Sequence, residues 1–583
     1  TVPGGGPGQN SGCIAPHARL AWLEPSASRP SRRARNASLT MLLQMALVAA
    51  ALTALSGGAT AAGSTRARLD IDLSKPRVPF DHTWEECIGS GHASLTLRAD
   101  WREHVAMARR DLGIKRVRFH GILDDDMSTS MGPSASSYVN VDSWADFMRE
   151  QNMSALVELG FMPRWLSRGR AGLGGFQCEH VLNHYAACVD PPSNFTQWGE
   201  VVGSLVAHLV ERYGLESVAD RWVFEVWNEP NLNGQADPLV PPPSTFAGGG
   251  DWWGTGMEYF ELYAHAARAL KTVSPRLKVG GPVTTGGAVW VKQFREFCRN
   301  NSVPIDFIST HAYPGGDTEI NSVASTVRQL AASKAAAGNL PHFVSEWGGS
   351  WQHGPVGPEG PGNATTGRCH DDYSAASFVV ALVDKAQGLA DLLSYWCISD
   401  VFEESGFPVA NSSFFGGFGV VNIYGVPKPA YRAFQILHEA GSQRFHTAFS
   451  GDASCVATLG AVATAPTEGQ LHLILYSQAP SGEPIEPMCE LEVVVHGALR
   501  AAGEGTLRRI DGEHANPMQR WIDLGMPQYP TSEENADILA ASALAPEPLR
   551  VRPTDGGLSF AVSLPAQGVA AVQLRLLPAG VFV

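Results

Sequence analysis

Two glutamates stand where an ionised side chain is costly. Glu229 follows the apolar residues of the segment VWNEP (226–230), and Glu346 follows those of the segment FVSEWG (343–348). A strand buried in a parallel sheet reads as an apolar run, so a charge at its end must be hydrogen-bonded or in use. Two such carboxylates facing each other across one pocket would provide the proton donor and the nucleophile or base that hydrolysis of a glycosidic bond requires.

The residues around Glu229 suit the role of proton donor. Pro230 fixes the turn at the strand end and has no backbone donor. A carboxylic acid that faces a second carboxylate has a raised pKa, so it can stay protonated and give its proton to a leaving oxygen. Glu346 would then be the ionised partner that attacks the anomeric carbon. For an isolated glutamate a salt bridge or a helix cap is the better interpretation, but the pair in these contexts favours catalysis.

The elements that must position the pair alternate between strands and helices from residue 85 to residue 440. Helical spacing of Tyr259, Leu262, Tyr263 and Ala266 predicts a helix over 255–273, and a second helix is predicted over 373–386. The expected strands are 87–89, 116–119, 155–159, 223–227, 278–280, 307–310, 342–345 and 392–396.

Eight strands separated by helices predict an α/β fold of the (β/α)8 barrel type, with the active site at the C-terminal ends of the strands. An open doubly wound sheet is the alternative, but it would need a glycine-rich loop, and none follows the first expected strand.

The rest of the chain divides by composition. Residues 1–40 are expected to be a disordered or spuriously translated leader. Residues 41–61 are expected to be a signal peptide, because a short apolar stretch has arginines before it and small residues after it. Residues 62–84 contain a strand expected to join the C-terminal domain. Residues 85–440 would form the catalytic barrel, and 441–583 a β-sandwich-like domain with a short helical insertion.

Bulk composition limits the possible partners. The 583 residues include 44% hydrophobic and 17% charged residues, which excludes wholesale disorder. Lys plus Arg total 43 against 57 Asp plus Glu, and the net charge of −14 argues against nucleic acid. No later segment reaches the length of about 18 apolar residues that a membrane span needs. No Cys/His cluster has metal-ligand spacing, so neither a metal nor another cofactor is predicted.

Cysteines and sequons agree with a secreted or lumenal location, whether extracellular, vacuolar or lysosomal. The expected disulfides are Cys178–Cys188 and Cys455–Cys489, each within one region of the chain. Glycosylation is expected at some of the five Asn-x-Ser/Thr asparagines. These are Asn152, Asn194, Asn300, Asn363 and Asn411.

The ordered motifs of the chain resemble glycoside hydrolase family 39, and within it the β-xylosidases. The likeness includes VWNEPN (226–231), VRFHG (117–121), VELGFMP (157–163), FISTHAY (307–313) and SYWCISDVFEE (394–404). It continues through GGFG (416–419) and VPKP (426–429). The Asn-Glu-Pro triplet alone is only moderately specific, whereas the ordered set is strong.

The resemblance implies a retaining exo-glycosidase that works through a covalent glycosyl-enzyme, with Glu229 as acid/base and Glu346 as nucleophile. Its carboxyl groups would lie about 5–5.5 Å apart. Asn228 would contact the sugar 2-hydroxyl, and His311 and Tyr313 would line the pocket and orient the nucleophile. The remaining expected sugar contacts are Trp396, Glu403, Glu404, His92 and His120. His92 and His120 are the weaker candidates, because a lone histidine is more often a satisfied core group.

The same family contains α-L-iduronidases, whose substrate carries a carboxylate that needs a cation. The strand-6 motif His311-Ala312-Tyr313 has no lysine, and residues 392–426 contain no Arg or Lys. The sequence therefore favours a β-xyloside or xylo-oligosaccharide substrate. An iduronidase-like enzyme is the alternative if Arg164 or Arg368 reaches the pocket. A non-catalytic carbohydrate-binding relative is a third possibility, although both glutamates are present. Cys397 stands where these xylosidases more often carry a hydroxyl residue, as a disulfide partner or a core filler.

Overall fold

The computed structural model describes most of the chain from residue 65 onwards. The described residues are 65–578, without 170–177, 182–184, 242–250, 316–319, 353–368, 403–412, 479–487, 498 and 502–503. The chain divides into two compact units, Thr1–Gly63 and Ser64–Val583, and everything described below belongs to the second unit. Among the described residues, helices long and apolar enough to cross a membrane are absent.

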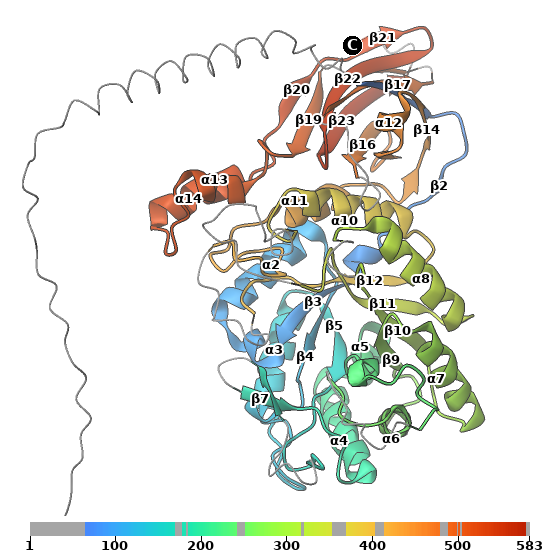
Figure 1. The fold of residues 1–583 in the computed structure, drawn as a ribbon, viewed down its shortest axis with the longest axis vertical. Coiled ribbons are helices and arrows are strands. Elements are labelled where there is room, and N and C mark those ends of the chain that lie inside the picture. The colour runs from blue at the N-terminus through green and yellow to red at the C-terminus, as the bar shows by residue number, and fades with distance from the viewer. Residues whose placement is uncertain are drawn as a thin grey trace, which may run out of the picture. The chain divides into compact units, whose positions relative to one another are not determined.

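The second unit contains a closed barrel of eight parallel strands (Figure 1). Its strands follow one another around the barrel in the order β10-β11-β12-β3-β4-β5-β8-β9, which confirms the predicted (β/α)8 fold. The strands are β3 (Cys87–His92), β4 (Arg116–His120), β5 (Ser154–Leu159), β8 (Val223–Val226), β9 (Val279–Thr285), β10 (Phe307–Ala312), β11 (His342–Trp347) and β12 (Leu392–Tyr395).

Amphipathic helices separate these strands. The helical spacing seen in the sequence is the buried face of α6 (Gly256–Val273), and a capping box between Thr255 and Glu258 defines where that helix begins. The other helices of the barrel are α2 (Ala99–Leu112), α3 (Val139–Glu150), α4 (Phe195–Tyr213), α5 (Leu215–Arg221), α7 (Ala288–Asn300), α8 (Val323–Ala337), α10 (Ser374–Lys385) and α11 (Pro429–His438). Short 3-10 helices are η1 (Thr83–Glu85), η2 (Ala93–Leu97), η3 (Asp125–Met127) and η4 (Pro230–Asn233). A hairpin of β6 (Cys178–Val181) and β7 (Tyr185–Cys188) lies between β5 and α4 in the sequence.

The C-terminal region forms two mostly antiparallel sheets, with strand orders β14-β1-β17-β22-β21 and β2-β13-β15-β16-β23-β19-β20. The strand β1 (Thr65–Asp72) comes from the N-terminal side of the barrel and pairs with both β14 and β17. The other bounds are β2 (Val78–Pro79), β13 (Gln443–Arg444), β14 (His446–Gly451), β15 (Leu459–Thr464), β16 (Gln470–Ser477), β17 (Met488–His496), β18 (Leu499–Ala501), β19 (Gly505–Ile510), β20 (Glu547–Leu549), β21 (Arg552–Thr554), β22 (Gly557–Pro565) and β23 (Val569–Pro578). Short helices are α12 (Ala453–Val456), α13 (Pro517–Asp523) and α14 (Ser532–Ala541).

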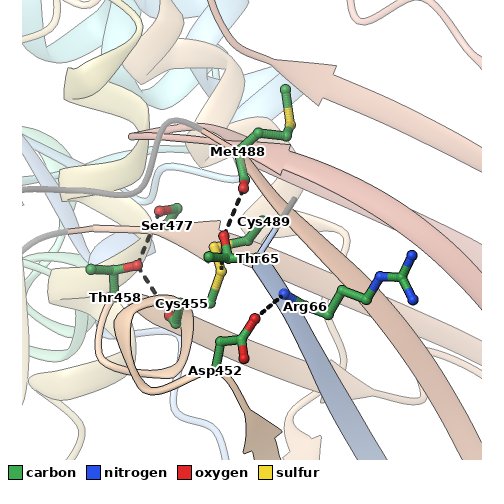
Figure 2. The surroundings of a disulfide bond; sticks show 8 residues. All are labelled: Thr65, Arg66, Asp452, Cys455, Thr458, Ser477, Met488 and Cys489. Atoms are coloured by element: carbon green, nitrogen blue, oxygen red, sulfur yellow. Dashed lines mark hydrogen bonds between the residues drawn. A yellow bond between two sulfur atoms is a disulfide. The ribbon is translucent and has the colours of Figure 1, made fainter. Parts of the chain in front are cut away.

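A disulfide joins α12 to β17 in this β-domain, next to the first residue of β1. Cys455 and Cys489 are bonded, as predicted, with their Cα atoms 5.9 Å apart. Figure 2 shows Thr65 beside them, donating its hydroxyl to the carbonyl oxygen of Met488 at 3.1 Å. Cys188 is also disulfide-bonded, and its backbone pairs with that of Cys178, whose side chain lies outside the described residues.

Polar contacts that are buried or partly buried join the β-domain to the barrel helices. The hydroxyl of Tyr476 on β16 donates to Asp384 on α10 at 2.6 Å, and Arg444 pairs with the same carboxylate at 2.7 Å. The hydroxyl of Ser377 on α10 donates to Gln478 at 2.5 Å. Because Asp384 is almost completely buried, these partners are needed to offset the loss of water from its charge.

Candidate active site

Glu229 and Glu346 lie at the C-terminal ends of barrel strands, where the sequence places them. Glu229 follows β8 in a left-handed backbone conformation (φ 38°), and Pro230 begins η4 directly after it. Glu346 lies near the end of β11 and is buried. One oxygen of each carboxyl group and one ring nitrogen of His311 all lie within 4.8 Å of one another. This separation is much shorter than the 6.5–9.5 Å that leaves room for a water molecule between the two groups.

Arg118 on β4 contacts several carboxyl groups of the site at once. Its side chain is completely buried, and Nη1 donates to Glu346 Oε1 at 2.5 Å. Its Nε donates to Glu225 at 2.6 Å, and Nη2 donates to Asn228 Oδ1 at 2.8 Å and lies 2.7 Å from Glu158. The guanidinium on β4 thus holds groups from β5, β8, the segment after β8 and β11, because its planar fork of donors is directed at several acceptors at once.

The environment of Glu229 favours its protonated form. The pKa of this carboxyl is raised to about 7, mainly by burial and also by the nearby Glu158, although the positive charge of Arg118 opposes the rise. Burial raises the pKa of Glu158 itself to about 8. Around neutral pH the site therefore holds carboxyl groups that retain a proton, as a general acid must.

His311 lies between the two glutamates. Its Nδ1 is 2.7 Å from Glu229 Oε1 and 3.4 Å from Glu346 Oε2. Burial lowers the pKa of His311 to about 4, so the ring is neutral at neutral pH. His311 was predicted to orient the nucleophile. Its shorter contact is to the candidate acid Glu229, so it is placed to orient both glutamates.

Tyr313 and His120 contact the candidate nucleophile. The hydroxyl of Tyr313 donates to Glu346 Oε2 at 3.0 Å, so Arg118 and Tyr313 hold the two oxygens of this carboxylate from different directions. His120 Nε2 lies 3.6 Å from Glu346 Oε1, and its Nδ1 is hydrogen-bonded to Glu158 at 2.7 Å. The orientation of Glu346 is therefore determined before any substrate arrives.

Asn228 is held on both sides of its amide. Its Oδ1 accepts from Arg118, and its Nδ2 donates to Asp251 at 2.7 Å. The predicted contact with a sugar 2-hydroxyl stays a prediction, but the direction of the amide is already set. Trp396 is almost completely buried, and its ring centroid lies 4.9 Å from that of His120, which places it beside the candidate nucleophile.

One further predicted sugar contact, His92, lies among the described residues. His92 is buried at the end of β3 and pairs through Nε2 with Asp126 at 3.1 Å and with Asp124 at 3.4 Å. Glu403 and Glu404 lie outside the described residues.

Two groups of described residues have donor atoms close enough to bind a metal ion: His92, Asp124 and Asp126, and Glu229, His311 and Glu346. In both groups the atoms that could bind a metal already take part in hydrogen bonds within the protein, so we assign no metal.

Three buried charges of the site were missed from the sequence, although each carries a signal. Arg118, Glu158 and Glu225 each stand within an apolar strand, in VRF, VEL and FEV. A charge inside such a strand must find a partner, so three of them on neighbouring strands point to one buried network.

Comparisons with known proteins agree with this geometry. Residues 67–558 match the sequence family described as Glycosyl hydrolases family 39. A β-xylosidase of Caldicellulosiruptor saccharolyticus is 34% identical over 528 residues, covering 87% of this chain and 98% of that protein. A human α-L-iduronidase is 24% identical over 174 residues, covering 29% of this chain and 21% of that protein. A solved structure of a GH39 β-xylosidase from Caulobacter crescentus has a TM-score of 0.67 at 26% identity, covering 87% of this chain and 99% of that one.

Proposed function

This chain belongs to glycosyl hydrolase family 39 and is a glycoside hydrolase, and we propose that it is a retaining, exo-acting β-xylosidase. The observation that carries the proposal is the short separation of Glu229 and Glu346 in unequal environments. Similarity to β-xylosidases over most of the chain supports the choice of sugar.

In the first step Glu346 attacks the anomeric carbon while Glu229 protonates the glycosidic oxygen. The raised pKa of Glu229 keeps its proton available near neutral pH. Arg118 and Tyr313 fix the attacking carboxylate, so little reorganisation is needed when the bond forms. The aglycone leaves as an alcohol, and the sugar remains as an ester of Glu346.

In the second step the oxygen of a water molecule attacks the anomeric carbon while Glu229, now ionised, takes a proton from that water. The ester bond to Glu346 breaks, and the two inversions together give net retention. His311 is 2.7 Å from Glu229 and neutral, so it can keep the carboxyl in place in both protonation states by changing which partner donates.

The charges at the site support a neutral sugar. The nitrogens of Arg118 are directed at protein acceptors and its side chain is completely buried, so it offers little to a substrate carboxylate. Arg164 is half exposed and lies 3.9 Å from Asp125. Arg368, the other cation considered for an iduronate, lies outside the described residues. Because Arg118 is already engaged by the protein's own groups, the pocket suits a sugar that carries hydroxyls and no carboxylate.

A side-by-side assay tests the proposal. Chromogenic β-xyloside, α-L-arabinoside, β-glucoside and α-L-iduronide are offered to the enzyme and to Glu346→Ala, and we expect the xyloside to have the highest kcat/KM. Cleavage of the iduronide alone would refute the choice of sugar. Undiminished activity of Glu346→Ala would refute the assignment of the nucleophile. A first-formed xylose whose anomeric hydroxyl is axial, detected by NMR, would refute retention.

We also propose a secretory route for the protein. The three described sequon asparagines, Asn152, Asn194 and Asn300, are all exposed, as glycan attachment requires. Expression in a eukaryotic secretory host followed by endoglycosidase treatment tests this, and an unchanged mass after treatment would contradict it.

A further inference from the structure

Lys428 is a fully buried cation held between two fully buried carboxylates. Its Nζ lies 2.5 Å from Asp371 Oδ1 and 2.6 Å from Asp400 Oδ2, and it donates to the carbonyl oxygen of Gly417 at 2.9 Å. Burying three charges costs free energy that their mutual attraction only partly returns. Such a cluster is therefore a weak device for stability alone, and its position in the barrel suggests another purpose.

The cluster joins the two connections that leave the last strands of the barrel. Asp371 lies after β11, the strand that carries Glu346, and just before α10. Asp400 and Gly417 lie in the connection after β12. Lys428 precedes α11 as its N-cap residue. One ammonium group therefore joins the chain segments that follow β11 and β12, at the end of the barrel where the candidate active site lies.

Glycines let the segments approach the carboxylates closely. The backbone N–H of Gly416 donates to Asp371 and that of Gly419 donates to Asp400, both at 2.7 Å. A Cβ atom on Gly419 would lie 2.2 Å from the backbone nitrogen of Asp400, which no side chain could tolerate. The GGFG and VPKP motifs of the sequence thus meet in one cluster.

Backbone hydrogen bonds lead from the cluster to the pocket wall. The N–H of Cys397 donates to the carbonyl of Phe418 at 3.1 Å, and the N–H of Val420 donates to the carbonyl of Cys397 at 2.9 Å. Cys397 itself is a buried thiol 3.4 Å from the carbonyl of Ser399. Its neighbour Trp396 contacts the ring of His120, which lies beside Glu346. A shift of the segment around Phe418 would therefore move Trp396.

We propose that Lys428, with Asp371 and Asp400, forms a positioning cluster that holds Trp396 as a wall of the sugar site. The proposal rests on the proposed function, since it takes Trp396 to contact the sugar. A wall touches the sugar equally in the ground state and the transition state, so its displacement raises KM more than it lowers kcat.

The test removes the three charges together, because removing one partner alone leaves an uncompensated buried charge. The variant Lys428→Met/Asp371→Asn/Asp400→Asn is expected to raise KM at least tenfold and to change kcat less than threefold. Active sites are counted by titration with a 2-deoxy-2-fluoro glycoside, so that a smaller folded fraction does not imitate a kinetic effect. The substrate is whichever glycoside the parent enzyme hydrolyses best, so a wrong choice of sugar would appear in the parent and not in this comparison.

Two further variants keep the outcome decisive. Asp400→Asn leaves one cation with one anion, so it should fold as the parent does and raise KM about threefold. The double variant Asp384→Asn/Arg444→Met removes a partly buried ion pair between barrel and β-domain, and it should lower Tm without changing KM. A KM within 1.5-fold of the parent in Asp400→Asn, or within twofold in the triple variant, would overturn the proposal, as would a raised KM in the control.

Discussion

The raised pKa of Glu229 predicts the basic limb of the pH profile. With a pKa of about 7, roughly 90% of the enzyme carries the catalytic proton at pH 6 and roughly 10% at pH 8. The value of kcat/KM for a xyloside with a poor leaving group should therefore fall about tenfold between these pH values. At the ordinary pKa of 4.5 less than about 1% would be protonated at pH 7, and the limb would lie below pH 5.

The variant Glu229→Gln isolates this carboxyl, because glutamine has the same shape and never ionises. We expect kcat/KM to fall by about 10²–10⁴ for a methyl- or phenyl-type leaving group and far less for dinitrophenyl xyloside, whose oxygen needs no proton. The basic limb should disappear in the variant. Glu211→Gln, on the exposed surface of α4, is the matched control and should keep the parent profile.

The same pKa shift also makes the free energy of unfolding depend on pH. A carboxyl whose pKa is raised on folding binds its proton more tightly in the folded protein, so stability is lost as pH rises from the unfolded pKa through the folded one. The shift from 4.5 to about 7 corresponds to at most about 3–4 kcal/mol of unfolding free energy. Glu229→Gln should therefore be more stable than the parent at pH 8 but not at pH 4, by urea unfolding. A basic limb that persists in Glu229→Gln, or no such pH-dependent gain, would refute the reasoning.

Three other changes should act through stability or through the site. Arg118→Met should lower the free energy of unfolding by about 3–5 kcal/mol, since it leaves buried carboxylates without their cation. Titration with the 2-deoxy-2-fluoro glycoside should then detect no active sites, and a stable, active variant would contradict the network. Cys455→Ser/Cys489→Ser opens a crosslink 34 residues apart and should cost about 4 kcal/mol in urea unfolding, with KM unchanged; unaltered unfolding would contradict it. Tyr476→Phe should cost about 1.5–3 kcal/mol, because a buried charge on Asp384 loses a donor, and a thermal melt equal to that of the parent would count against the contact.

Strand ends were the part of the site that the sequence could locate. Glu229 and Glu346 stand out because apolar runs stop at them, and the barrel brings such ends to one face. Whether Arg118 points into the barrel, and which carboxyl groups it meets, depends on closure of the sheet, which a linear pattern does not contain. The roles of the catalytic and sugar-binding residues stay predictions that the variants above address.

The strand β9 shows a second reason why sequence patterns are incomplete. It was expected to end at Gly280 but continues through Pro282 to Thr285. Gly280 packs directly against the ring of Phe307, and an added Cβ would lie 2.4 Å from that ring. The glycine that breaks the strand pattern in the sequence is thus the residue that lets β9 and β10 pack closely.

The placement of β1 has a consequence for how the chain folds during synthesis. Thr65 pairs with Cys489, so β1 leaves the ribosome more than 400 residues before the strand that will lie beside it. At about 5–20 residues per second, this interval is on the order of 20–80 s. Its other partner, β14, ends at Gly451, shortly after α11 completes the barrel at His438, so β1 has neither partner while the barrel is being synthesised. A pulse-labelled nascent chain should therefore keep a protease-sensitive amino end until β14 has left the ribosome.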